Sequence, residues 1–187
     1  MTTSFRNGSM VYVCSAARAA RLTMSMNTSG DIDAIISIAD PSAGKRPPRE
    51  GLHSIPHRLL LSFDDVLKDD PAYTSPTIAD VERIIAFDRA LRGRVRPGKR
   101  LLIHCHAGIS RSAAAALAIL ADRCGPGREA ESIELLKVAT EDGKPLPNSL
   151  MMAFADELLG RDGALREAAG KLYRLGALLA GQVSDAG

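Results

Sequence analysis

Tryptophan is absent from this chain, and the other aromatic residues are scarce, at 4% of 187 residues. The core must therefore be built mainly from leucine, isoleucine, valine and alanine. The remaining composition is that of a globular protein, with 45% hydrophobic and 25% charged residues and a mean hydropathy of −0.02. The length suits one domain over residues 1–187, with a core over about 10–160 and a C-terminal helix over 161–187.

Cysteine is also rare, and long apolar runs are missing. Three cysteines, Cys14, Cys105 and Cys124, are too few for a disulfide framework, and an odd count fits a reducing compartment. No apolar run approaches the ~18 residues of a membrane helix. Arg18 and Arg21 interrupt the N-terminal segment where a signal peptide needs an unbroken apolar stretch. We therefore expect a cytoplasmic protein without a membrane partner.

An excess of charge of either sign is lacking as well. The chain carries 24 basic and 22 acidic residues, a net charge of +2, which does not indicate a nucleic-acid partner. Basic residues do gather in residues 89–100, "RALRGRVRPGKR". We interpret this segment as a solvated helix end and loop, with contact to an acidic partner as the alternative.

Four short apolar runs predict strands. They are continuous rather than alternating, which is typical of strands that are buried on both faces. The segment 40–51 between the second and third run has the composition of a loop. The predicted strands cover residues 10–14, 34–39, 57–63 and 100–105.

Helical patterns lie between and after these runs. One is expected to start at Ser75–Pro76 with an apolar stripe, a second follows Arg111, and a third covers about 128–140. The stripe comprises Ile78, Val81, Ile84, Ile85 and Leu91.

Two more helices are expected near the C-terminus. One follows Asn148 and stops at Gly160, and the last runs over about 163–180 and carries a row of leucines that we expect to pack on the chain's own domain. That row comprises Leu165, Leu172, Leu175, Leu178 and Leu179. The pattern predicts an α/β fold, with a small, mostly parallel four-stranded sheet flanked by helices and a helical C-terminal part.

The segment "LLIHCHAGISRS", residues 101–112, predicts a strand, a loop and the start of a helix. Ligands bind at the C-terminal ends of parallel strands, and the free N–H groups of a helix start form a nest for an anion. Gly108 permits an unusual backbone conformation in the loop, and Arg111 offers a planar fork to phosphate oxygens. The same positive surroundings favour the thiolate of Cys105, to which the Ser112 hydroxyl could donate.

These residues resemble the His-Cys-x5-Arg-Ser/Thr motif of the cysteine-dependent protein tyrosine phosphatases, in their dual-specificity or atypical branch. The resemblance implies catalysis by Cys105, Arg111 and Ser112, and a loop that binds the phosphate of a phosphoprotein, or free phosphate, sulfate or vanadate. It implies a phosphocysteine intermediate and no cofactor or metal. The implied phosphate-binding residues are His106, Ala107, Gly108, Ile109, Ser110 and Arg111.

The resembled family also uses an aspartate as a general acid, on a loop before the cysteine. Asp65 is the preferred candidate because it lies two positions after the apolar strand end at Phe63. Its 40-residue separation from Cys105 is long for this family. This separation leaves the choice open: Asp64 is one alternative, and Asp69 or Asp70 would shorten the separation. Asp40 is interpreted as a turn residue before Pro41.

Other chemistry is possible for parts of this loop. His104 and His106 flank the cysteine, but neighbouring strand residues point to opposite faces, so we do not expect a metal site. We expect His104 to be packed and to orient the loop, and His106 to be partly exposed at its rim. A weakly active or non-catalytic phosphoprotein-binding module, and a rhodanese-type sulfur transferase, are rival interpretations.

The loop sequence also bears on substrate and redox chemistry. Phosphoinositide phosphatases of the superfamily carry lysines where this chain has His106 and Ile109, so a lipid substrate is a further alternative. Cys124 lies at the far end of the following helix, roughly 28 Å from Cys105 at the rise of an α-helix, which leaves Cys14 as the better disulfide partner.

Overall fold

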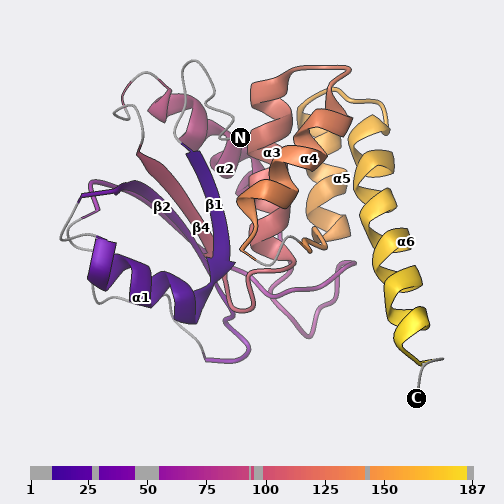
Figure 1. The fold of residues 1–187 in the computed structure, drawn as a ribbon, viewed down its shortest axis with the longest axis horizontal. Coiled ribbons are helices and arrows are strands. Elements are labelled where there is room, and N and C mark those ends of the chain that lie inside the picture. Colours follow the sequence, from indigo (N-terminus) through magenta and orange to yellow (C-terminus); the bar gives the residue numbers. More distant parts are fainter. Residues whose placement is uncertain are drawn as a thin grey trace.

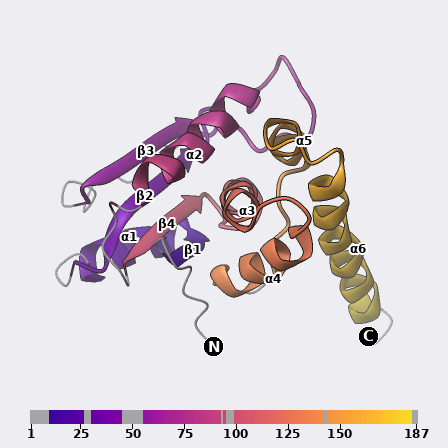
Figure 2. The same cartoon turned by 90° about the horizontal axis from the view of Figure 1, so that it is seen from above.

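The computed structural model describes residues 10–26, 30–44, 55–92, 94, 99–141 and 144–184. Its centre is a sheet of four parallel strands in the order β1-β4-β2-β3, shown in Figures 1 and 2. The expected four-stranded α/β sheet is confirmed. The strands are β1 (Met10–Ser15), β2 (Ile32–Ala39), β3 (His57–Ser62) and β4 (Arg100–Cys105).

Burial separates the two central strands from the edge strand β3. Every residue of β2 is buried, as is every residue of β4 after Arg100. In β3 burial alternates, and Leu60 is 51% exposed. The prediction of strands buried on both faces is therefore right for β2 and β4 and wrong for β3, where alternate residues are exposed. The other edge strand, β1, is partly buried, with Val13 and Cys14 fully buried.

Helices cover both faces of the sheet. Figure 1 shows α1 on one side and α3 to α6 on the other. The sequence analysis did not predict α1, whose Ala19 packs with Cys14 and Leu102 in a small second cluster. The helices are α1 (Ala16–Met26), α2 (Ile78–Leu91), α3 (Arg111–Cys124), α4 (Glu129–Ala139), α5 (Ser149–Leu158) and α6 (Ala164–Ser184).

Helix α3 occupies the centre of the main core, and Figure 2 shows it end-on with α2, α4 and α5 around it. The four alanines Ala113–Ala116 have no exposed surface. Alanine favours helix formation and its small side chain lets the neighbouring elements approach closely. The alanine-rich run after the loop thus holds the start of α3 firmly against β4.

The start of α2 differs from the sequence prediction. Thr77, rather than Ser75, is the N-cap, and it forms a capping box with Asp80. The expected stripe is buried at Val81, Ile84, Ile85 and Leu91, whereas Ile78 is 37% exposed. The reciprocal hydrogen bonds of a Thr and an acidic residue three positions later satisfy free N–H groups at the helix start, which favours this boundary over the proline.

The C-terminal helices begin and end as expected. Asn148 caps α5, and Gly160 has a positive φ of 60° just after that helix. In α6, Leu165 and Leu172 are buried in the main core. The side chains of Leu175, Leu178 and Leu179 lie outside the described residues, as do residues 45–51 of the loop segment and most of 93–98 in the basic segment.

Candidate active site

The phosphate-loop candidate, residues 105–111, connects the end of β4 to the first residue of α3. Gly108 has a φ of +80°, and a Cβ there would lie 2.4 Å from the carbonyl carbon of Cys14. Glycine is thus required twice, by its backbone conformation and by the close passage of β1. The loop is also held by hydrogen bonds from Ala16 N to His106 O, 3.1 Å, and from Leu146 N to Ile109 O, 3.0 Å.

The Cys105 sulfur lies at the base of this loop and is buried. The backbone N–H of Gly108 donates to Sγ over 3.3 Å. The Ser112 hydroxyl lies 3.2 Å from the same atom, as the sequence analysis expected. The Gly108 N–H and the Ser112 hydroxyl can both donate a hydrogen bond to a sulfur anion, and the N-terminus of α3 adds partial positive charge.

Arg111 is buried, and one end of its guanidinium is fully occupied. Its Nη1 donates to the carbonyl oxygen of Phe63 over 2.9 Å and approaches that of Ala39 at 3.4 Å. Nη1 also forms an ion pair with Asp40. The buried Nε has no hydrogen-bond partner among the described residues. The strand ends therefore fix the orientation of the guanidinium and leave its Nε without a hydrogen bond from the described residues.

Asp65 lies directly beside the loop. Its Oδ1 accepts hydrogen bonds from Ser110 Oγ, 2.7 Å, and from Asn148 Nδ2, 2.8 Å. Its Oδ2 is 3.7 Å from Arg111 Nε, and the side chain is 35% exposed. This carboxyl group therefore lies near the guanidinium and is partly open to solvent.

The neighbouring Asp64 is enclosed instead. It accepts hydrogen bonds from Ser42 Oγ, 2.5 Å, from Ser42 N, 3.2 Å, and from Thr74 N, 2.9 Å. Burial alone would raise the pKa of the Asp64 carboxyl, but these hydrogen bonds, with Arg111 nearby, outweigh burial and lower the pKa. A buried carboxylate held in this way stabilises the loop and is poorly suited to donating a proton.

The more distant aspartates lie elsewhere in the turn. Asp70 Oδ1 accepts a hydrogen bond from Ala72 N over 2.9 Å, and Asp69 is exposed. Within the described part of the chain, neither residue forms a hydrogen bond or ion pair with residues 105–112. The geometry favours Asp65 over all three alternatives.

The two histidines take the positions expected of them. His104 is buried and its Nε2 lies 2.8 Å from Ser37 Oγ on β2, whereas His106 is exposed at the rim. The described residues hold no cluster of side chains suited to a metal ion.

The other cysteines are separated from the loop. Cys14 packs on the α1 face of the sheet, whereas Cys105 packs on the α3 face. Burial, with Glu141 nearby, raises the pKa of the Cys14 thiol to about 12. Side chains that point to opposite faces are poorly placed for a disulfide, which argues against Cys14 as the partner of Cys105. Cys124 ends α3, and no disulfide is formed among the three.

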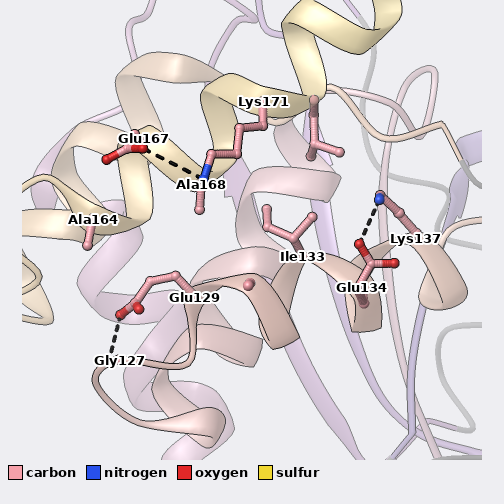
Figure 3. A pocket seen from close by; sticks show the side chains of 11 residues that line it. Gly127, Glu129, Ile133, Glu134, Lys137, Ala164, Glu167, Ala168 and Lys171 are labelled. Atoms are coloured by element: carbon pink, nitrogen blue, oxygen red, sulfur yellow. Dashed lines mark hydrogen bonds and ion pairs between the residues drawn. The ribbon is translucent and has the colours of Figure 1, made fainter.

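Two pockets lie away from the loop. Figure 3 shows one of about 430 Å³ between α4 and α6, where Ile133 lies among charged side chains such as Glu129 and Lys171. The other, about 420 Å³, lies between α5 and α6 beside Met152 and Tyr173. Neither contains a residue of the loop. No helix in the described ranges is both long and apolar enough to cross a membrane.

The sequence analysis did not predict the roles of two residues near the loop. Asp40 was read as a turn residue, although it pairs with Arg111. Asn148 was read only as a helix start, although it also contacts Asp65. The position of Asp40 at the C-terminal end of β2 was the available signal. No sequence signal pointed from Asn148 to the acid, because 83 residues separate them.

Comparisons with known proteins bear on the fold. No protein-family model and no curated protein matches the sequence. Among solved structures, the human tyrosine phosphatase-like serine/threonine/tyrosine-interacting protein is similar with a TM-score of 0.58 and 17% identity, over 80% of this chain and 90% of that one.

Two other structures give the same result. Human DUSP28 has a TM-score of 0.54 and 22% identity, over 78% of this chain and 88% of its own. DUSP15 has a TM-score of 0.53 and 22% identity, over 88% of this chain and 91% of its own. At these identities the likeness shows the fold: the chain has the α/β fold of the cysteine-dependent, dual-specificity type of protein phosphatase. The expected resemblance is confirmed at that level.

The buried His104 makes stability depend on pH. Burial lowers the pKa of its imidazole from 6.5 to about 4. Between these values the unfolded chain binds a proton that the folded chain does not, so stability present above pH 6.5 is lost as the pH falls toward 4. We expect the free energy of unfolding to fall by on the order of 3 kcal/mol over this window. His104→Asn, measured by denaturant unfolding at the same pH values, should show a clearly smaller fall; an equal fall would contradict the assignment.

Proposed function

We propose that this protein is a phosphomonoester hydrolase that works through a phosphocysteine intermediate. The observation that carries the proposal is the buried Arg111, whose Nη1 is held by Asp40 while Nε has no hydrogen-bond partner among the described residues and lies 3.7 Å from Asp65 Oδ2. It lies six residues from Cys105 and shares its loop. A guanidinium oriented in this way is suited to two oxygens of a phosphate group, and the loop N–H groups are suited to the rest.

In the first step, the Cys105 thiolate attacks phosphorus. The sulfur–phosphorus bond forms as the bond from phosphorus to the ester oxygen breaks, and protonated Asp65 gives its proton to that oxygen. The product alcohol or phenol leaves, and phosphate stays on sulfur. Arg111 stabilises the charge that develops on the phosphoryl oxygens.

In the second step, water attacks the phosphocysteine. The Asp65 carboxylate takes a proton from the water. At the same time the water oxygen bonds to phosphorus and the phosphorus–sulfur bond breaks. The thiolate returns, and the Ser112 hydroxyl, 3.2 Å from Sγ, can stabilise it as it leaves. Neither step calls for a metal or another cofactor.

The substrate class we propose is phosphotyrosine in proteins, with dual specificity as its wider form. Ile109, a loop residue, is 41% exposed and offers an apolar contact to an aromatic ring. His106 and Ile109 occupy the loop positions where superfamily lipid phosphatases carry lysine, which disfavours a polyanionic headgroup. We further propose that the whole chain acts as one domain and works in the cytoplasm, where its free cysteines would stay reduced.

A phosphoprotein-binding module is the second candidate. One structure of this fold belongs to a protein whose name describes it as phosphatase-like and as an interacting protein. Such a module would need the anion-binding loop but no acid. The position of Asp65 beside Arg111 favours turnover, and a phosphate-release screen of phosphotyrosine peptides, phosphoserine and phosphothreonine peptides and phosphoinositides separates the candidates.

The nucleophile is tested by Cys105→Ser. Turnover should fall by several orders of magnitude, since the serine hydroxyl is a much weaker nucleophile and no base adjoins it. Binding of inorganic phosphate or vanadate should persist, because the loop binds through its backbone and Arg111. Cys124→Ser, at the far end of α3, is the matched control and should keep normal turnover. Residual activity of Cys105→Ser within about tenfold of the wild type would remove Cys105 from the mechanism.

The acid is tested with leaving groups of different basicity. Asp65→Asn should slow hydrolysis of a phosphotyrosine peptide by about 10²–10⁴, and hydrolysis of nitrophenyl phosphate much less, because nitrophenolate leaves without a proton. The basic limb of its pH–rate profile should also flatten. Asp64→Asn is the neighbouring control: it should destabilise the fold without creating this leaving-group dependence. The reverse pattern would show that Asp64 is the acid.

A further inference from the structure

The carboxyl group of Asp65 is held asymmetrically. Both of its hydrogen bonds, from Ser110 Oγ at 2.7 Å and from Asn148 Nδ2 at 2.8 Å, reach the same oxygen, Oδ1. The other oxygen, Oδ2, is 3.7 Å from Arg111 Nε, on the side where a phosphate would bind. A carboxyl oxygen that already accepts from two donors is a poor place for a proton, whereas Oδ2 can carry one.

The Asn148 amide can be oriented in only one way by its surroundings. Its Nδ2 donates to Asp65 and to the carbonyl oxygen of Val66, 2.9 Å, while its Oδ1 accepts from Met151 N, 3.0 Å. A flipped amide would turn an acceptor toward two acceptors and a donor toward an N–H. Asn148 is 1% exposed, so water cannot easily replace these bonds.

Asn148 also reaches the phosphate loop through its backbone. Its N–H donates to the carbonyl oxygen of Ser110 over 3.3 Å. Asn148 therefore contacts three parts of the site: the start of α5, the segment that carries Asp65, and Ser110, which donates the second hydrogen bond to Asp65. A shift of any one segment would move the other two.

The charged and titratable surroundings of Asp65 come from two helices. Arg111 of α3 lies beside Oδ2. Tyr173 of α6 is close enough that its pKa is raised, first by burial and then by the negative charge of Asp65. Asn148 and Ser110 are neutral donors, so they orient the carboxylate without adding charge to the site.

We propose that Asn148 and Ser110 are positioning residues that fix the Asp65 carboxyl group, so that Oδ2 carries the proton given to the leaving group. This role rests on the proposed phosphatase function. During cleavage the Oδ2–H bond breaks as the leaving oxygen gains the proton and its bond to phosphorus breaks. In hydrolysis of the phosphocysteine, Oδ2 regains a proton from water, while Oδ1 keeps both donors throughout.

The test uses the full chain and two single changes. Asn148→Ser keeps an oxygen that can cap α5 but removes the amide donor, and Ser110→Ala removes the other donor without touching the cap. Each should slow hydrolysis of a phosphotyrosine peptide by roughly ten- to a hundredfold, a clearly larger factor than for hydrolysis of nitrophenyl phosphate. Ser149→Ala changes the first residue of α5, which does not bond to Asp65 in the described structure, and should leave both rates unchanged.

The same changes made in Asp65→Asn distinguish positioning from a general structural effect. If Asn148 acts through the acid, Asn148→Ser should add almost nothing to Asp65→Asn, since residues that work as a unit are non-additive. Equal slowing of both substrates by Asn148→Ser, or full additivity in the double variant, would overturn the proposal.

A measurement without turnover keeps this inference separate from the proposed function. In the wild type, the side-chain amide resonances of Asn148 should shift as Asp65 is titrated, and Asp65→Asn should abolish the shift. If the wild type hydrolyses no phosphoester, the proposed function fails, and this shift alone decides whether the hydrogen bonds exist. Asn148 resonances that do not respond to pH would overturn the inference whether or not the enzyme turns over.

Discussion

The ion pair between Arg111 and Asp40 is the interaction on which the site depends. A guanidinium that is removed from water is costly unless it is paired and hydrogen-bonded. Here Asp40 and the carbonyl oxygens at the ends of β2 and β3 satisfy Nη1. The cation can therefore stay buried under the loop, with its remaining edge directed to an anion. The parallel sheet matters to this site because it brings these strand ends to the first residue of α3.

The same sheet edge brings together the three residues of the proposed mechanism, Cys105, Arg111 and Asp65. Cys105 is the last residue of β4, and Asp65 follows β3 by three residues. Gly108 lets the loop pass against the backbone of β1. Asn148 then joins α5 to both the acid and the loop. The rigid parts are helices and strands, and the reactive groups lie where they meet, which favours precise positioning.

Much of this arrangement could be predicted from residues that lie close together in the sequence. The run from Leu101 to Ser112 holds the strand end, the glycine, the arginine and the start of the helix within one short segment, and its structure is as expected. The choice of Asp65 over Asp64 was harder, because adjacent residues share one sequence context. It depends on Ser42 and Thr74 enclosing Asp64.

Other features were beyond prediction because they depend on tertiary contacts. The partner of Arg111 comes from the end of β2, 71 residues earlier (111 − 40). Helix α1 is different: its alanines, arginines, leucine and methionines favour a helix, so the local sequence could have predicted it. The exposure of Leu60 follows from the position of β3 at the edge, which no local pattern reveals.

The central claim is that Cys105 carries the phosphoryl group between the two steps. The most direct measurement is to mix the enzyme with an aryl phosphate, quench in acid within the first turnover, digest the protein and locate phosphate by mass spectrometry. The account predicts one phosphate on the peptide that contains Cys105, which accumulates further in Asp65→Asn if that change slows hydrolysis of the intermediate more than its formation. Turnover of the same substrate with no phosphate on Cys105, or with phosphate on another residue, would contradict it.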